Sequence, residues 1–591
     1  MLYLVGAKTT EMRKLFILSL SLCLFITSFS QTNLVTKANY QLTARFSPKK
    51  LEKLIFTTSV DPHWLKKGDR FWYSYETPGG RKWYIVDPAK ASKQELFDNA
   101  KLAALITSIV KDPFDAQHLG IENLKFIKDE NSIQFEIKSS VEIEKKDSTK
   151  KPPVTTKEKK VYYFEYNLLT GAITELKDYQ KPKPRASWAS ISPDKQWVIF
   201  SRNYNLYWMD SANYKKALQN EDDSTIVETK LTTDGIENYS YGGESFGETN
   251  VDKEKNKSKR KSAFVFWSPD SKFFTFVRSD NRKVKDLWVI NSVAEGRPTL
   301  ETYKYHMPGE TEAPERELLV FDFPAKTFKK INTSAFKNQE IGVSGKPSLE
   351  RERDDEFRAS VWLGTNDYFY LTRTSRDLKK IDICKIDIKT GEPKVLIEER
   401  MNTYVETRRL GLINDGKEMV QWSERDGWGH FYLYDGDGKL KNQITSGAFH
   451  CEDIVGIDEK SRVLYFTANG REANEDPYYL HLYRINLDGS NLKLLNPGDF
   501  DHSLSMDDDD KYFVDNFSRV NTVPKSVLFD ATGRKIMDLE TADLSRLMEA
   551  GYKFPQPFKV KADDGITDLY GVMYKPFDFD STKKYPIIEY V

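Results

Sequence analysis

One structural theme recurs along most of this chain and limits what it can fold into. Between about Gly68 and Met537, a run of aromatic and β-branched residues at period two is followed by a turn and a second such run. Period-two alternation is typical of β-strands, because successive side chains point to opposite faces of a sheet. Clear copies begin at Ser192, Trp267 and Asn414, and their second runs end at Asp210, Asn291 and Asp435.

The turns and the number of copies indicate a ring of small sheets. Pro-Asp at 193–194 and Asp-Gly at 415–416 suit tight connections between strands. About eight units at irregular spacing predict an all-β fold, an eight-bladed β-propeller over residues 68–555 with helical insertions. Closure of such a ring protects its edge strands. The weaker copies start near Arg70, Asn131, Thr365, Arg462 and Asp510.

Some stretches interrupt the strand pattern. Ser92-Lys93-Gln94-Glu95 has the form of a capping box and precedes apolar residues at helical spacing, which predicts an inserted helix. Residues 144–160 and 253–261 are rich in lysine and are interpreted as solvated loops. Residues 542–550, closed by Gly551, predict a short helix that ends the repeat region.

The N-terminal residues have the pattern of an export signal. A basic pair at 13–14 precedes the apolar run 15–29, which is too short to span a membrane comfortably. We expect residues 1–30 to be a signal peptide whose translation starts at Met12, with cleavage before Gln31. The mature protein is then exported, either to the periplasm or to the medium.

Charge and cysteine content exclude several classes of protein. Lys plus Arg and Asp plus Glu are equal at 89 each, whereas a nucleic-acid binder carries a basic excess. A lipid anchor at Cys23 is disfavoured, because the residues before it lack the expected small side chain. Cys384 and Cys451 are too few for a disulfide scaffold, and the sequence leaves open whether they pair. No second apolar stretch is long enough to cross a membrane.

Three motifs look like catalytic or metal sites but lack the context that such sites need. Gly243-Glu244-Ser245-Phe246-Gly247 matches the Gly-x-Ser-x-Gly nucleophile elbow, yet polar and charged segments flank it instead of a strand and a helix. His450-Cys451 is the only adjacent pair of possible metal ligands and is interpreted as a blade edge. The acidic runs 435–438 and 507–510 are interpreted as hairpin turns, since the distant glutamate of a calcium loop is missing. No metal or cofactor is expected.

The final stretch predicts the beginning of a second domain. Ile587-Ile588 follow Lys583-Lys584-Tyr585-Pro586 as an apolar run typical of a buried strand. A buried strand needs partners for its backbone groups. We therefore expect the domain that begins at residues 556–591 to continue past Val591.

Several segments, in a consistent order, carry a family resemblance. Residues 241–246 are similar to a Tyr-Glu-Glu-Glu-x-Phe segment, and residues 423–430 to a Ser-x-Glu-x-Gly-x-x-His turn. Residues 481–485 and 516–519 are similar to later blades, and residues 583–586 to the start of a hydrolase domain. Together they resemble the dipeptidyl peptidase IV family, within the prolyl oligopeptidase class of serine peptidases. The resemblance covers roughly residues 33–591.

This resemblance implies a propeller above an α/β-hydrolase domain. Residues 31–67 are then an N-terminal segment near the hydrolase domain, which begins at residues 556–591. In the family, the acidic segment binds the free amino terminus of the peptide substrate. An ammonium group has three donors and binds carboxylates well. Glu244 is the one carboxylate left here, because Gly242 and Gly243 replace the others, so products other than dipeptides are allowed.

The resemblance places no catalytic residue in this chain. The family's oxyanion-hole tyrosine, elbow serine, aspartate and histidine all follow the strand that begins at Tyr585, and Tyr590 stands one position too early. Cys384 resembles a disulfide cysteine of the animal members. The position of its partner, near Val395, holds no cysteine, so that bridge is not expected.

The implied function is gating and substrate positioning in an exported serine exopeptidase that cleaves peptides after proline or small residues. By itself the chain would be inactive, because the triad is missing. The resemblance also allows a homodimer. The alternative is a secreted propeller that binds peptides or proteins and catalyses nothing.

Overall fold

The computed structural model describes residues 33–35, 37, 39–147, 154–242, 247–346 and 357–590. These residues form two compact units. The larger unit comprises Ser59–Phe517 and Lys525–Glu540, and the smaller one the described residues up to Thr58, Ser518–Pro524 and those from Thr541 onward. The predicted signal peptide and Cys23 lie outside the described residues.

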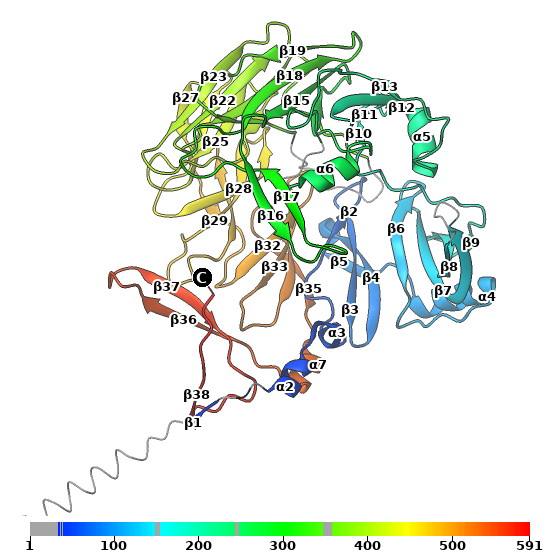
Figure 1. The fold of residues 1–591 in the computed structure, drawn as a ribbon. Coiled ribbons are helices and arrows are strands. Elements are labelled where there is room, and N and C mark those ends of the chain that lie inside the picture. Colours follow the sequence, from blue (N-terminus) through cyan, green and yellow to red (C-terminus); the bar gives the residue numbers. More distant parts are fainter. Residues whose placement is uncertain are drawn as a thin grey trace, which may run out of the picture. The chain divides into compact units, whose positions relative to one another are not determined.

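The larger unit contains eight four-stranded sheets that follow one another along the chain (Figure 1). The first four are β2 (His63–Trp64), β3 (Phe71–Thr77), β4 (Gly80–Asp87) and β5 (Ser92–Glu95); β6 (Ile121–Ile127), β7 (Ser132–Asp147), β8 (Val154–Asn167) and β9 (Ile173–Glu175); β10 (Ser190–Ile191), β11 (Trp197–Arg202), β12 (Asn205–Asp210) and β13 (Thr229–Lys230); and β14 (Val265–Trp267), β15 (Phe273–Asp280), β18 (Glu315–Asp322) and β19 (Thr327–Ile331).

The last four are β20 (Glu340–Val343), β21 (Tyr368–Thr374), β22 (Lys380–Asp387) and β23 (Pro393–Arg400); β24 (Gly411–Ile413), β25 (Glu418–Ser423), β26 (His430–Asp435) and β27 (Leu440–Gln443); β28 (His450–Asp458), β29 (Val463–Asn469), β30 (His481–Asn486) and β31 (Lys493–Leu494); and β32 (Asp501–Met506), β33 (Tyr512–Ser518), β34 (Lys525–Asp530) and β35 (Lys535–Thr541). The predicted repeats fall on strands of this series, with one correction. In the copy that begins at Trp267, the second run, which ends at Asn291, is not the partner of the first: it forms β16 (Asp286–Asn291) in an inserted sheet, and β15 pairs with β18 instead. In the third sheet, by contrast, Trp197 of β11 lies opposite Asp210 of β12.

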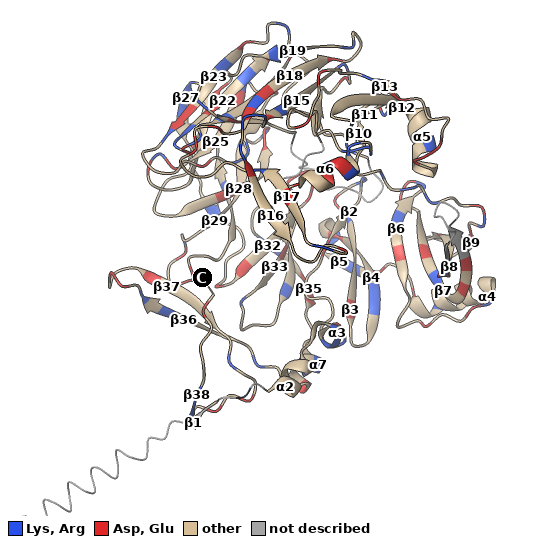
Figure 2. Cartoon of the chain, in the orientation of Figure 1, with Lys and Arg blue, Asp and Glu red and all other residues tan. Residues whose placement is uncertain are grey.

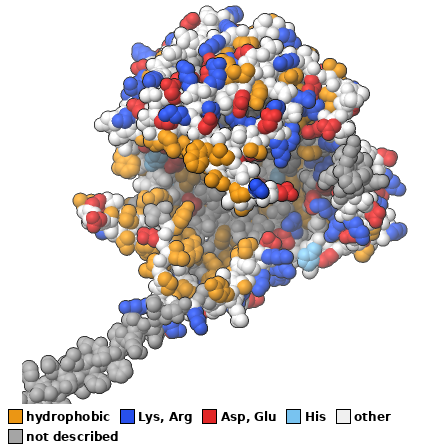
Figure 3. Space-filling view, viewed as in Figure 1, with side chains coloured by type: hydrophobic (Ala, Val, Ile, Leu, Met, Phe, Trp, Pro, Cys, Tyr) orange, Lys and Arg blue, Asp and Glu red, His pale blue; other side chains and the backbone are white. Residues whose placement is uncertain are grey.

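Several elements are inserted between these strands. A two-stranded sheet of β16 (Asp286–Asn291) and β17 (Thr299–Lys304) separates β15 from β18. It exposes large apolar side chains, including Trp288 and Ile290, and Figure 3 shows hydrophobic side chains gathered over this part of the face. The other insertions are η1 (Pro88–Lys90), α4 (Asn99–Val110), α5 (Ser211–Gln219) and α6 (Asn250–Asn256).

Shared hydrophobic clusters hold neighbouring sheets together. Among the described residues, such clusters join the first sheet to the second and every consecutive pair from the third to the eighth. Another joins the last sheet to the first, through Phe71 and Tyr73 on one side and Val514 and Leu528 on the other. Full burial of one large apolar side chain in such an interface is worth about 1.5–3 kcal/mol. The arrangement is that of a β-propeller.

Charge does not distinguish one sheet from another. Figure 2 shows lysine and arginine interspersed with acidic residues over the strands.

Hydrogen bonds add local links between sheets. The indole of Trp422, which is fully buried, donates to the carbonyl oxygen of Cys451 in the next sheet at 2.7 Å. Among the described residues, no helix is both long and apolar enough to cross a membrane.

The capping-box interpretation of residues 92–95 is wrong, although a helix follows. These residues form β5, whose ladder with β4 satisfies their backbone groups. Asp98 caps α4 instead, accepting a hydrogen bond from the backbone N–H of Lys101 at 3.0 Å. The short helix predicted at residues 542–550 is confirmed as α7 (Ser545–Glu549).

The interpretation of the two lysine-rich stretches as loops is wrong for residues 144–147, 154–160 and 253–256, whereas residues 257–260 form neither helix nor strand, as predicted. β7 and β8 extend as a hairpin to Asp147 and from Val154. Opposite charges meet across its two strands, as in the diagonal ion pair of Glu142 with Lys157 at 3.9 Å. The second stretch overlaps α6, where the buried Lys253 donates to Asn238 Oδ1 at 2.9 Å. Residues 148–153 lie outside the described residues.

The smaller unit joins the N-terminal segment to the C-terminal one. β1 (Asn33–Leu34) pairs in parallel with β38 (Lys583–Lys584). Near α2 (Tyr40–Arg45) and α3 (Pro48–Leu51), the ring of Phe46 packs on Phe577 at 4.3 Å between centroids. β36 (Gln556–Lys561) and β37 (Asp568–Met573) form an antiparallel hairpin. The buried strand predicted after Pro586 is not formed: Ile587 and Ile588 are 92% and 95% exposed, because no described strand offers their backbone a ladder.

The two cysteines are free and buried. Cys384 on β22 lies directly opposite Val395 on β23, the position where the sequence placed a missing partner. Burial raises the pKa of the Cys384 thiol to about 11 and that of Cys451 to about 12. Both thiols therefore stay protonated and unreactive at neutral pH.

The turn between β32 and β33 generates a prediction about stability. Burial, and then the carboxylates of Asp507 and Asp458, raise the pKa of Asp510 to about 7. Since the unfolded value is about 3.9, folding must take up a proton at Asp510 between pH 4 and 7. Asp510→Asn removes this cost and retains a residue suited to the positive φ of 55°. Its stability gain should grow from pH 4 to pH 7 and level off above, at about 1 kcal/mol or more.

Denaturant unfolding at pH 5, 6, 7 and 8 measures this gain. Asp437→Asn is the matched control, because this turn aspartate is held ionised by Lys394, which lowers its pKa. The control should not gain stability at any pH. A gain for Asp510→Asn that is equal at pH 5 and pH 8 would show that the carboxyl is not the cause.

Candidate functional site

An open cleft in the larger unit is lined by residues that flank Glu244 in the sequence. Its volume is about 870 Å³, within the range of about 300–1,000 Å³ common for small-ligand sites. Gly242 and Gly247 both line it. Residues 243–246, with Glu244 and Ser245, lie outside the described residues. The structure thus places both residues that flank this segment at the wall of one cleft.

A buried arginine supports residues 239–242, which precede Glu244 in the sequence. Arg278 on β15 lies under the rings of Tyr239 and Tyr241, at 3.7 and 4.5 Å from their centroids. Its guanidinium forms ion pairs with Asp234 at 2.8 Å and with Glu317 at 3.1 Å. A guanidinium suits this place because it stacks on aromatic faces and donates in several directions at once.

The two tyrosines complete a closed hydrogen-bond network. The hydroxyl of Tyr241 donates to Asp234 Oδ1 and that of Tyr239 to Glu317 Oε2, both at 2.8 Å. Burial and the Glu317 hydrogen bond raise the pKa of Tyr239 to about 12. Burial lowers the pKa of Arg278, but hydrogen bonding to Asp234 and the nearby tyrosines raise it by more. All members therefore keep their charge states at neutral pH, and residues 239–242 have a fixed support.

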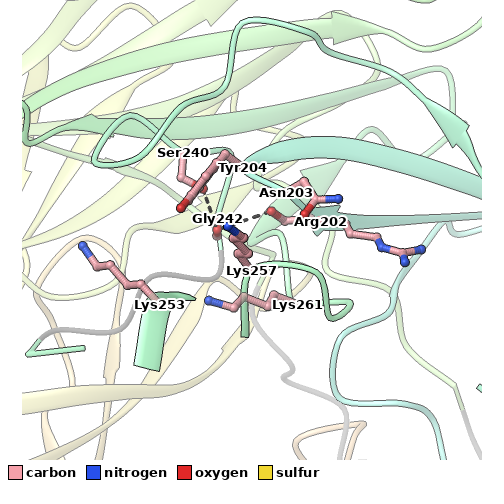
Figure 4. Close-up of a pocket in the computed structure, with 9 residues that line it drawn as sticks. Arg202, Asn203, Tyr204, Ser240, Gly242, Lys253, Lys257 and Lys261 are labelled. Atoms are coloured by element: carbon pink, nitrogen blue, oxygen red, sulfur yellow. Dashed lines mark hydrogen bonds between the residues drawn. The ribbon is translucent and has the colours of Figure 1, made fainter. Parts of the chain in front are cut away.

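A second, much smaller cleft lies behind Gly242 (Figure 4). Its volume is about 10 Å³, enough for about one water molecule. The carbonyl oxygen of Gly242 accepts hydrogen bonds from Ser240 Oγ at 2.9 Å and from Ser201 Oγ at 3.3 Å. In Figure 4 the guanidinium of Arg202 points away from Gly242, and it pairs with Glu228 at 2.8 Å. The hydrogen bonds at this cleft fix the backbone at Gly242, and the cleft itself is too small for a substrate.

Glycine is required at position 242. Its φ is +108°, which residues with a side chain rarely adopt. A Cβ atom there would lie 2.9 Å from the carbonyl oxygen of Ser262. Glycine at this position therefore lets the chain pass close to Ser262 of a neighbouring loop.

The His450-Cys451 pair does not form a joint site. Neighbouring residues of a strand point to opposite faces, and the two side chains have different partners. Cys451 Sγ contacts Thr445 Oγ1 at 3.4 Å and His430 Nδ1 at 3.7 Å, whereas His450 Nε2 lies 3.5 Å from a carboxylate oxygen of Glu452. The acidic runs at 435–438 and 507–510 are turns, as predicted, since Asp435 accepts backbone N–H bonds within its own loop.

Sequence reasoning missed Arg278, although a signal was present. Phe274, Phe276 and Arg278 alternate along β15, so all three share one face, and both phenylalanines are buried. A charged residue that continues a buried period-two series must find partners. Those partners, Asp234 and Glu317, are distant in sequence and were not identifiable from it.

Comparisons with known proteins agree with this architecture. A family model described as the dipeptidyl peptidase IV (DPP IV) N-terminal region matches residues 154–524. Dipeptidyl peptidase 4 of Arthroderma otae is 24% identical over 456 residues, which are 72% of this chain and 52% of that protein. Dipeptidyl peptidase 4 of Trichophyton rubrum is 23% identical over 457 residues, with the same coverage. The chain spans about half the length of the curated relatives it matches.

Solved structures show the same fold. Porphyromonas gingivalis dipeptidyl peptidase 4 superposes with a TM-score of 0.55 at 18% identity, over 93% of this chain and 68% of that one. A structure from Bacteroides ovatus gives a TM-score of 0.58 at 18% identity, over 94% of this chain and 69% of that one. Because the family model matches more than half of the residues, this chain belongs to the family of dipeptidyl peptidase IV N-terminal regions.

Proposed function

We propose that this chain is the gating and substrate-positioning part of an exported serine exopeptidase that hydrolyses peptides after proline or small residues. The match to the dipeptidyl peptidase IV N-terminal region carries the proposal. The cleft flanked by Gly242 and Gly247 gives it a location. The eight sheets are then the blades of one propeller over residues 68–555.

The catalytic step would use residues outside this chain. A Ser-His-Asp triad transfers the acyl group of the peptide through a covalent intermediate, with an oxyanion hole to stabilise the developing charge. The propeller adds no reacting group. The chain alone is therefore inactive. Its role is to admit peptides of limited size and to bind one end of the substrate.

The smaller unit supports a hydrolase domain that starts at residues 556–591, with residues 31–67 beside it. Its β36–β37 hairpin exposes large apolar side chains, visible in Figure 3. Such apolar faces typically mark a contact with another element. The N-terminal segment contacts the same region, since Asn39 Nδ2 donates to Asp578 Oδ2 at 3.0 Å.

Glu244 is proposed to bind the free amino terminus of the substrate. In a longer protein that includes the proposed hydrolase domain, Glu244→Gln should raise KM at least tenfold for alanyl-prolyl p-nitroanilide, because a charged hydrogen bond is lost. Its kcat should change little. The KM for the N-acetylated substrate, which lacks the ammonium group, should be the same with and without the substitution.

Steady-state kinetics with both substrates measure this difference. Glu254→Gln is the control, because Glu254 is an exposed acid on α6 that pairs with Lys257. Equal KM values for the acetylated and free substrates in the unchanged enzyme would remove Glu244 from this role. A longer protein that cleaves neither substrate would favour the non-catalytic binding propeller.

Arg278 is expected to position the segment without touching substrate. Arg278→Met leaves Asp234 and Glu317 buried without their cation, which should cost about 3 kcal/mol of unfolding free energy. It should raise KM for the free substrate, because residues 239–242 lose their support. Arg278→Lys keeps the charge but stacks less well, so both effects should be smaller.

Denaturant unfolding and kinetics, each compared with the exposed Arg534→Met, check this prediction. A variant that loses stability with no change of KM under folding conditions would show that Arg278 is structural only.

A further inference from the structure

The large cleft and a third one meet at a single exposed ring that lines both. The third cleft has a volume of about 280 Å³ and includes Arg185 in its lining. Phe264 lines both clefts and is 76% exposed. A phenylalanine this exposed, between two clefts, offers an apolar surface to whatever enters them.

Two cations of the large cleft form ion pairs with carboxylates. Lys304 pairs with Asp286 at 3.2 Å, and Arg316 with Glu340 at 2.8 Å. These pairs neutralise the positive charge that their side chains would otherwise present to a ligand.

Arg376 differs from the other cations of the large cleft. It lies in the turn between β21 and β22, is half-buried, and lines the cleft. Among the described residues it has no hydrogen-bond or ion-pair partner, and the same holds for Arg185 in the adjoining cleft. A half-buried guanidinium without a carboxylate leaves local positive charge in a chain whose formal net charge is zero.

The remaining walls suit a peptide. Tyr303 and Tyr305 on and after β17 meet edge to face, with ring centroids 6.2 Å apart. Pro308 and Pro314 continue this wall. Aromatic and proline surfaces bury aliphatic side-chain stems, while the arginine would orient a charged end.

We propose that these two clefts form a subsite for an acidic residue of the peptide, whose side-chain carboxylate pairs with the guanidinium of Arg376. The planar guanidinium accepts a carboxylate in a two-point geometry that lysine does not provide. Phe264 packs on the aliphatic part of the same peptide, and Arg185 extends the positive surface. This inference rests on the proposed function in that it takes a peptide as the ligand.

Fluorescence anisotropy with the chain of this sequence tests the subsite without catalysis. The probes are two dye-labelled peptides with amidated C-termini, Ala-Pro-Ala-Glu-Ala-Ala and Ala-Pro-Ala-Gln-Ala-Ala. We expect the Glu peptide to bind about two- to fivefold more tightly at low salt, since a partly screened ion pair is worth this much. The preference should shrink at 0.5 M NaCl. Equal binding of the two peptides at low salt would overturn the subsite.

Two variants assign the effect to Arg376. Arg376→Gln should abolish the preference, and Arg376→Glu should favour the peptide with Lys in place of Glu. Arg534→Gln, a change of an exposed arginine paired with Asp530, is the matched control and should retain the preference. Circular dichroism and thermal unfolding of each variant establish that it is folded. A preference that survives in a folded Arg376→Gln protein contradicts the assignment.

The subsite and the proposed function fail separately. If the longer protein hydrolyses prolyl peptides but treats Glu and Gln peptides alike, the subsite is wrong and the peptidase proposal stands. If the chain prefers the Glu peptide through Arg376 but the longer protein cleaves nothing, the subsite stands and the peptidase proposal is wrong.

Discussion

Burial between neighbouring sheets is the constraint on which the larger unit depends. A four-stranded sheet of this composition has apolar side chains on both faces, and one sheet alone would leave both in water. Each sheet therefore needs a partner on each side, and the series ends only when the last sheet packs on the first. Among the described residues, the second and third sheets share no such cluster, so this junction depends on other contacts.

The same packing supplies a rigid frame for the clefts. β15 belongs to the core through Phe274 and Phe276, and its next inward residue, Arg278, is thereby fixed where the segment before Gly242 passes. The buried guanidinium then needs aromatic faces and carboxylates, which Tyr239, Tyr241, Asp234 and Glu317 provide. Core packing thus fixes the position of residues 239–242 through Arg278. A substitution in the network around Arg278 would displace this loop and would not alter a reacting group.

Charged side chains that stabilise this fold differ from those proposed to bind a ligand. Charges that support the fold are paired, as in the buried contact of Arg373 with Asp382. Arg376 has no such partner among the described residues, although it lies three residues along the chain from Arg373. An unpaired arginine adds little to folding, because exposed charges are worth little alone. Its value lies in what it binds, which is why we assign it to recognition.

Much of the fold was determined by the sequence itself, and most of the site was not. Period-two runs and turn residues are local signals, so the hairpins near Trp197 and Glu418 were predictable from neighbouring residues alone. The strand at Phe273 was also predictable, but its partner β18 was not, because an inserted sheet separates the two along the chain. Local signals also misled: Ser92–Glu95 reads as a helix cap, but a ladder with β4 decides its structure. The exposed tail at Ile587 reads as a strand, yet a strand exists only with a partner. Glu244 was found through family resemblance, whereas Arg278 and Arg376 depend on residues brought together from different sheets. Only tertiary structure decides such contacts, because pairing and burial of charge depend on distance in space and not on position along the chain.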